Sequence, residues 1–221
     1  MKFRFVIVLL ALCLNACNVH RVHEKTAQSQ AEPAGLVQVN KSQFDTSFLL
    51  PDTNLNQYKK IILSDLDFSN VKIIKPASSH AFQQPWELTK EDKQYYQEKF
   101  TASAKNFLFD SDKYSQATES ASDTFILKTK IIEIAPLASK DDFRSRSNFI
   151  DVYSEGFGRM TIVFELYDSV SNKLIFLSSD EHDLGNTWEK NDRLQNNVQV
   201  RLAFDYWLRS LSQELNAISK K

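Results

Sequence analysis

The chain has 221 residues, of which 42% are hydrophobic and 25% charged, and its formal net charge is −1 at pH 7. This length and composition predict a single folded domain with a sizeable core. With only four Gly and five Pro, the chain is not of a low-complexity or collagen-like class. Basic residues are not in excess, so nucleic-acid binding driven by counterion release is not expected.

The first 16 residues are predicted to form a signal peptide. Lys2 and Arg4 give its start a positive charge, and a compact apolar run follows from Phe5 to Leu12. This run is shorter than the about 20 apolar residues that a transmembrane helix needs. Removal of residues 1–16 leaves 25 basic residues (27 minus Lys2 and Arg4) against 28 acidic ones, a net charge of −3.

The end of the leader resembles the lipobox of bacterial lipoproteins. In Leu14-Asn15-Ala16-Cys17, an aliphatic residue stands three positions before the cysteine and a small residue directly before it. The resemblance implies cleavage before Cys17 and attachment of lipid to its thiol, which gives stable membrane anchoring when two or three acyl chains are present. An ordinary secretory peptide followed by a fortuitous cysteine is the alternative.

Two further observations bear on the anchor. The second cysteine, Cys13, leaves with the leader, so lipidation would block the one remaining thiol in an oxidising compartment. Asn18, rather than Asp, follows Cys17, which favours the outer membrane in enterobacterial-type sorting. The expected location is therefore the cell envelope, lipid-anchored at the outer membrane and facing the periplasm.

The pattern after Cys17 predicts a tether and then six elements in chain order. Residues 17–43 carry no apolar period and are expected to be the lipidated N-terminus and a flexible tether. Alternation or helical spacing of apolar residues predicts the elements that follow. They are a strand at 58–68, a helix from Thr89 to about 109, strands at 124–135, 158–168 and 174–179, and a helix at 192–218.

Local signals support several of these boundaries. Thr89 can cap its helix, because an acidic residue follows three positions later as in a capping box. Residues 168–173 are predicted to form the turn of a hairpin. In the last helix an apolar stripe is expected to face the sheet and to consist of Leu194, Val198, Leu202, Leu208, Leu211, Leu215 and Ile218, with Phe204 and Trp207 beside it.

The predicted order is therefore β-α-β-β-β-α within one α+β domain at residues 44–221. An antiparallel-rich sheet of about four strands, with two helices packed on one face, would bury every apolar stripe.

With these elements placed, the chain resembles a family of proteobacterial lipoproteins described as domain of unknown function 3313. The resemblance spans roughly residues 44–216 and consists of short motifs in a fixed order. They are Phe48-Leu49-Leu50-Pro51, Leu55, Tyr58-Lys59-Lys60, Leu88-Thr89, Gly158 to Ile162, Glu165 to Ser169, Asn172-Lys173-Leu174, and Phe204, Trp207, Leu211 and Leu215 in the last helix. The family implies a small α/β envelope lipoprotein and brings no catalytic or binding residues.

Three clusters of polar residues are candidate chemical sites. His20 and His23 have metal-ligand spacing, but they lie in the expected tether and have no further ligand nearby. Asp65 and Asp67 would share a strand face, and a solvated strand end is the interpretation that we favour. Glu181-His182-Asp183 places a histidine between two carboxylates and is interpreted as a surface turn. No catalytic residue, metal or cofactor is therefore expected.

Aromatic residues in predicted loops form another group. Trp86 and the segment from Phe143 to Tyr153, which includes Arg144 and Arg146, could contact a protein partner or a glycan, or could instead cover the open end of the sheet.

Two functions follow from the sequence. The favoured one is a non-enzymatic binding or assembly accessory anchored at an envelope membrane, with a membrane and an envelope protein as partners. The alternative is a hydrolase that acts on envelope material. A deep pocket with convergent Asp and His would favour the hydrolase, whereas an apolar groove or an open strand edge would favour binding.

Overall fold

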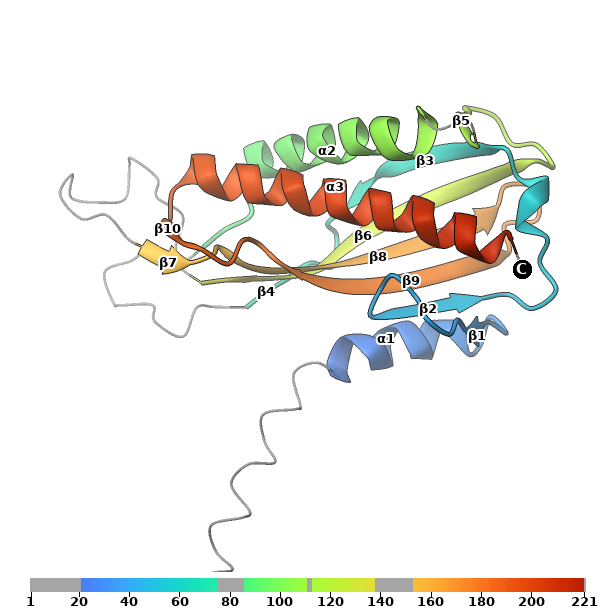
Figure 1. Cartoon of the computed structure of the whole chain (residues 1–221), viewed down its shortest axis with the longest axis horizontal. Coiled ribbons are helices and arrows are strands. Elements are labelled where there is room, and N and C mark those ends of the chain that lie inside the picture. The colour runs from blue at the N-terminus through green and yellow to red at the C-terminus, as the bar shows by residue number, and fades with distance from the viewer. Residues whose placement is uncertain (1–20, 75–85, 111–112, 138–152, 221) are drawn as a thin grey trace, which may run out of the picture.

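The computed structural model describes residues 21–74, 86–110, 113–137 and 153–220. Most of them form one layered domain in which α2 and α3 lie on one face of a large sheet and α1 lies on the other (Figure 1). The helices are α1 (Arg21–Ala31), α2 (Lys90–Ala104) and α3 (Arg193–Ile218). The strands are β1 (Val37–Gln38), β2 (Thr46–Leu49), β3 (Lys60–Asp67), β4 (Lys72–Ile73), β5 (Ser115–Gln116), β6 (Thr124–Pro136), β7 (Tyr153–Glu155), β8 (Gly158–Asp168), β9 (Leu174–Asp183) and β10 (Trp188–Lys190).

The predicted sheet of about four strands with two helices on one face is wrong. The main sheet has eight strands in the order β1-β2-β9-β8-β6-β3-β5, with β4 also paired to β6, and β10 and β7 form a second sheet of two strands. β1, β2, β9, β8 and β6 pair antiparallel, whereas β3, β4 and β5 join in parallel. The sheet is mixed because α2 lies on the crossover that connects β3 to β6.

Strands β8 and β9 are buried on both faces along most of their central residues, which explains their composition, whereas β6 alternates between buried and half-buried residues. From Gly158 to Glu165 in β8 nearly every residue is buried, because helices cover the sheet from both sides. The main core lies under α2 and α3, and its largest fully buried side chains include Tyr96, Phe100, Phe125, Phe164, Phe176, Phe204 and Trp207. A smaller cluster lies on the other face under α1 and contains Ala27, Ala31, Leu36, Phe48, Val163 and Leu177.

Helix α2 starts where the sequence predicts. The Thr89 hydroxyl accepts a hydrogen bond from the Asp92 backbone N–H, and the Asp92 carboxylate accepts one from the Thr89 backbone N–H, so the capping box is complete. After Ala104 the chain continues as a π-helical turn at Lys105–Phe109. Such turns are rare in proteins, and many of those that occur lie at functional sites. This end of α2 is therefore a candidate position for a functional site.

Helix α3 begins at Arg193, capped by Asp192, but its buried face differs from the predicted stripe. Leu208, Leu211 and Leu215 are buried as predicted, together with Val200, Ala203, Phe204 and Trp207. Leu194 and Leu202 are instead exposed on the outer side of the helix. Trp207 and Phe204 bury more surface than a leucine, so the helix is rotated to place these aromatic residues in the core.

Part of the expected tether is folded. Residues 21–31 form α1, and Ala27 and Ala31 on this helix pack against Phe48 and Leu177 of the sheet. Small alanine side chains let the helix lie close to the strands. Packing of the described chain therefore begins before residue 44, where the sequence placed the domain boundary.

The β7–β10 pair lies at one end of the domain, next to the start of α3 (Figure 1). Gly156 and Gly185 both have positive φ angles, and a Cβ atom on Gly156 would lie 2.2 Å from the Gly185 carbonyl oxygen. The two backbone segments can therefore approach this closely only with glycine at position 156.

Candidate functional site

The outer edge of β3 is open along most of its length. Strand β5 pairs with β3 only at Lys60 and Ile61, and the last hydrogen bond from this side runs from the Ala117 backbone N–H to the Ile61 carbonyl. Beyond Ile61, no other strand among the described residues pairs with this edge. An open edge presents backbone N–H and C=O groups that can pair with an additional strand.

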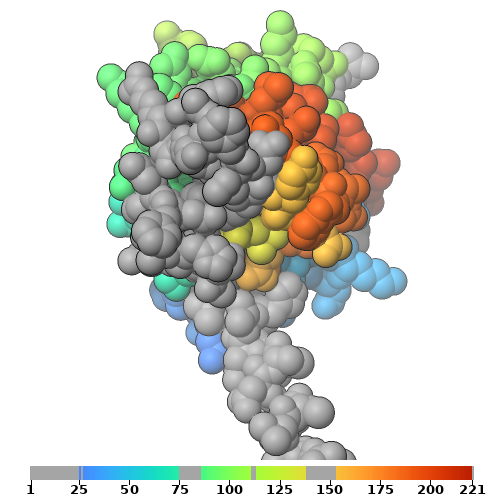
Figure 2. Space-filling view, turned by 90° about the vertical axis from the view of Figure 1, so that its left-hand side faces the viewer, coloured from blue at the N-terminus to red at the C-terminus, as the bar shows by residue number. Residues whose placement is uncertain are grey.

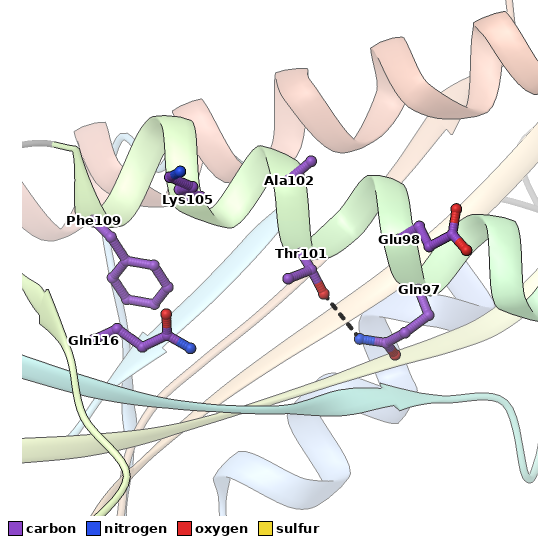
Figure 3. Close-up of a pocket in the computed structure, with 7 residues that line it drawn as sticks. All are labelled: Gln97, Glu98, Thr101, Ala102, Lys105, Phe109 and Gln116. Atoms are coloured by element: carbon purple, nitrogen blue, oxygen red, sulfur yellow. Dashed lines mark hydrogen bonds between the residues drawn. The ribbon is translucent and has the colours of Figure 1, made fainter.

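A side chain of α2 takes the place of a neighbouring strand at one point on this edge. Oε1 of Gln97 accepts a hydrogen bond from the Leu66 backbone N–H at 2.7 Å, as a strand carbonyl would. Nε2 of Gln97 donates to Oγ1 of Thr101 at 3.1 Å, which fixes the carboxamide (Figure 3). The β3 ladder to β6 shifts register between Leu63 and Leu66, so this contact follows a bulge.

A groove of about 440 Å³ lies beside this edge, between α2 with its π-helical turn and strand β5 (Figure 3). Phe109 from the turn and Gln116 from β5 stand at one end, and Gln97 stands toward the other. Its lining is completed by Glu98, Thr101, Ala102 and Lys105. The site thus combines apolar surface, two carboxamides, a hydroxyl and one charge of each sign.

A second polar cluster is buried between α3 and strand β9. Oδ2 of Asp180 accepts from Nε1 of Trp207 at 2.8 Å, and Oδ1 accepts from the Asp45 backbone N–H at 3.0 Å. Burial raises the pKa of Asp180 to about 7, although the Trp207 hydrogen bond acts in the opposite direction. Nearby, the buried Glu214 carboxylate accepts from the Gln43 backbone N–H at 2.8 Å.

Asp180 has a near-neutral pKa, but it lies where a substrate cannot reach it. Asp180 is buried and both of its carboxylate oxygens accept hydrogen bonds from the protein. His182 lies two residues along β9, stacked on Tyr206 with ring centroids 4.4 Å apart. Burial lowers the pKa of His182, so this imidazole is neutral at pH 7. The cluster is a helix-to-sheet contact rather than an open acid–base site.

The structure places the sequence-predicted polar residues as follows. His182 lies in β9 and pairs with Met160, so the interpretation of residues 181–183 as a surface turn is wrong. Asp65 is exposed at the β3 bulge. Asp67 accepts from the Ser69 backbone N–H at 2.8 Å, and hydrogen bonds from Ser69 lower its pKa. Cys17 and His20 lie outside the described residues.

The aromatic residues are divided between core and surface. Trp86 is buried in the main core. Phe143, Arg144 and Arg146 lie outside the described residues, whereas Tyr153 is exposed on β7. Gln97 and Gln116, which frame the groove, carried no signal in the sequence, because an isolated glutamine has no characteristic spacing.

Two properties of the described chain are relevant to membranes and metals. No helix in the described ranges combines the length and apolar character that a membrane crossing requires. Within the same ranges, no group of three or more His, Cys, Asp or Glu side chains is placed to hold a metal ion.

Solved structures with a related chain path are distant in sequence. Protein XCC0632 from Xanthomonas campestris has 9% identity and a TM-score of 0.44, with 77% of this chain and 91% of that chain covered. The PelC dodecamer from Paraburkholderia phytofirmans has 10% identity and a TM-score of 0.37, covering 76% and 96%. A putative neuraminyllactose-binding hemagglutinin homolog from Helicobacter pylori has 8% identity and a TM-score of 0.39, covering 75% and 87%. These similarities are too distant to transfer a function.

No curated protein matches the sequence. A family match, by contrast, covers most of the chain: residues 27–211 match the family described as "Protein of unknown function (DUF3313)". The match includes part of α1, all ten strands and most of α3, and it agrees with the resemblance found in the sequence. The chain belongs to the DUF3313 family.

Proposed function

We propose that this protein is a lipid-anchored, non-enzymatic binding protein of the bacterial envelope that receives an extended segment of a partner protein along the outer edge of β3. The observation that carries this proposal is the open edge itself, where the Gln97 carboxamide occupies the position of a missing strand at Leu66. An extended segment that adds to a sheet edge gains main-chain hydrogen bonds, and adjacent pockets select its side chains.

The groove beside the edge defines the chemistry of such a segment. Gln116 carries a donor and an acceptor, as a peptide group does, whereas the Gln97 carboxamide is already held by Leu66 and Thr101. Glu98 and Lys105 contribute opposite charges, so the lining has no net charge, and Ala102 and Phe109 add apolar surface. A neutral segment with an apolar side chain directed at Phe109 fits this lining best.

The anchor would keep the folded domain near a membrane. The lipobox-like sequence ends at Cys17, and α1 begins only four residues later at Arg21. Four extended residues span at most about 14 Å. A lipid on Cys17 would therefore hold the folded domain close to the bilayer surface, where envelope protein partners are at high effective concentration.

The alternative, a hydrolase acting on envelope material, finds less support. It requires an acid or base that a substrate can reach. Asp180 has the appropriate pKa of about 7, but it is buried and hydrogen-bonded on both oxygens. The groove contains one carboxylate, Glu98, and no histidine or cysteine.

The experiment that tests the binding site is site-specific photocrosslinking in intact cells. A benzoylphenylalanine is placed at Thr101, in the groove, or at Gln213, which is exposed on α3. We expect one discrete adduct from position 101 and none from position 213. Ala102→Arg, at an exposed position, should abolish the adduct by filling the groove. Identical adducts from both positions, or an adduct insensitive to Ala102→Arg, would contradict the proposal.

The anchor is tested separately with a clickable palmitate analogue. We expect the wild-type chain to incorporate the label and Cys17→Ser to lose it. Equal labelling of the two proteins would show that Cys17 is not the site of lipid attachment. It would not affect the interpretation of the crosslinking experiment on the groove.

A further inference from the structure

We propose that the outer face of the β7–β10 pair binds a neutral glycan chain. This face consists of Tyr153, Glu155, Trp188 and Lys190 and is called the ribbon face below. It lies at the end of the domain opposite β5 (Figure 1), so the inference is independent of the groove beside β3. Figure 2 looks onto this end, where β7 borders the start of α3.

The strand register puts the four side chains on one face. Trp188 pairs with Glu155 and Lys190 pairs with Tyr153 in an antiparallel ladder. Residues directly opposite one another, and residues two apart on a strand, point to the same side of the sheet. Ser154, between Tyr153 and Glu155, points to the other side and is buried, as the register requires.

Buried hydrogen bonds on the opposite side hold the β7–β10 pair in place. Oγ of Ser154 donates to the Gly156 carbonyl at 2.6 Å and accepts from Nδ2 of Asn191 at 2.8 Å. The backbone N–H of Phe157 donates to the Leu184 carbonyl at 2.7 Å, and both side chains are buried in the core. The ribbon face is therefore a preorganised surface, which lowers the entropic cost of binding.

The aromatic residues of this face are unusually accessible. Trp188 is 71% exposed and Tyr153 is 51% exposed, whereas Trp86 is 6% exposed and Trp207 is fully buried. A large aromatic side chain that stays in water on a rigid support forgoes the stabilisation that burial would give. Binding of a ligand over the two rings would recover it.

The ligand class follows from the rings and the charges between them. Tyr153 and Trp188 occupy diagonal positions, about 7–8 Å apart in a regular ladder. The faces of these rings are electron-rich and attract the weakly positive C–H groups on one face of a sugar ring. The Glu155 carboxylate can accept from sugar hydroxyls, and Lys190 can donate to them. The two charges cancel, which favours a neutral chain over nucleic acid or an anionic lipid.

Trp188 provides the readout for the test, because the other two tryptophans are buried. The full chain is purified in a detergent without a sugar headgroup and titrated with cellopentaose, chitopentaose and maltopentaose. We expect at least one of these probes to give a saturable blue shift of the emission and to protect it from acrylamide. Calorimetry on the same samples measures binding without the fluorophore. Phosphatidylcholine vesicles are titrated in parallel.

Variants distinguish specific binding from a general effect. Tyr153→Ala should weaken binding of the active oligosaccharide by about tenfold or more, as expected when an aromatic contact is lost. Trp188→Phe should remove the emission change but keep calorimetric binding. Val170→Ala, at an exposed position on the β8–β9 turn, should change neither. A shift with vesicles and none with oligosaccharides, no response to any probe, or equal binding by Tyr153→Ala would overturn the proposal.

Discussion

The indole N–H of Trp207 donates to Oδ2 of Asp180 at 2.8 Å, which joins the middle of α3 to strand β9 inside the protein. The same carboxyl group accepts from the backbone of Asp45 just before β2. One buried acid therefore connects two strands and a helix, and its protonation state affects all three.

The first prediction concerns the pH dependence of stability at Asp180. Burial raises its pKa from 3.8 to about 7, so between these values the folded chain keeps a proton that the unfolded chain releases. Stability should therefore fall as pH rises from about 4 to about 7, and then level off. The side chain in Asp180→Asn stays neutral at every pH. In denaturant melts, the unfolding free energy of the variant should therefore rise relative to that of the wild type as pH increases across this window.

The difference between the two proteins reports on the Asp180 carboxyl and on its coupling to the groups around it. Asp45 and Glu181 face the carboxyl from the β2 and β9 sides, and Tyr206 and Glu214 lie on α3. Asp168, whose hydrogen bonds from Ser171 and Tyr58 help to lower its pKa, contributes in the opposite sense in both proteins. A difference in unfolding free energy that does not change between pH 4 and 7 would contradict the assignment to Asp180.

The second prediction concerns the buried face of α3. Leu211 is fully buried in the main core, whereas Gln213 is exposed on the same helix. Leu211→Ala should lower the free energy of unfolding by about 2–5 kcal/mol, because it leaves a cavity. Gln213→Ala should change it by no more than about 0.5 kcal/mol. Equal midpoints for both variants in chemical denaturation would show that α3 is not packed on the sheet.

A third prediction tests whether α1 is part of the folded domain. Ala31 is buried against the sheet, and Gln30 is exposed on the same helix. Ala31→Asp places an unpaired carboxylate in the small cluster and should release α1. Trypsin should then cut after Lys25 much faster than in the wild type, while Gln30→Asp should behave like the wild type. Rapid cutting of the wild-type chain at Lys25 would mean that α1 is not docked in solution.

A fourth prediction separates backbone strain from steric clash at two glycines. Gly35 and Gly156 have nearly the same positive φ, 72° and 73°, but a Cβ atom on Gly35 meets nothing within 4 Å. Gly35→Ala should cost about 1–2 kcal/mol, the usual cost of this conformation. Gly156→Ala should cost clearly more, because its Cβ atom would meet the Gly185 carbonyl. Similar losses in thermal unfolding would argue against the close crossing of the two segments.

The sequence located the long elements well because their signals are local. The capping box of Thr89 and Asp92, and the alternation through β6, lie within a few residues of one another. β1, β4 and β5 have only two residues each and show no period, so the eight-stranded sheet could not be predicted. Leu202 was placed in the core by its spacing, but the larger Phe204 and Trp207 determine the rotation of the helix.

The candidate site was harder to predict because it depends on long-range pairing. That β3 forms a sheet edge follows from its parallel pairing with β6, across the crossover that contains α2. Gln97 acquires its role from the position of α2 over Leu66, and Trp188 acquires its role from the register with Glu155. None of these contacts has a signature within one segment of sequence.

The pairing of β2 with β9 has a consequence for how the chain folds. Asp45 contacts Asp180, 135 residues later, and Gln43 contacts Glu214, 171 residues later. Closing loops of this length before any contact is gained slows folding. The segment that contains β2 must therefore wait for β9 and α3 before it can pair, and until then its backbone groups are open to pairing with other chains.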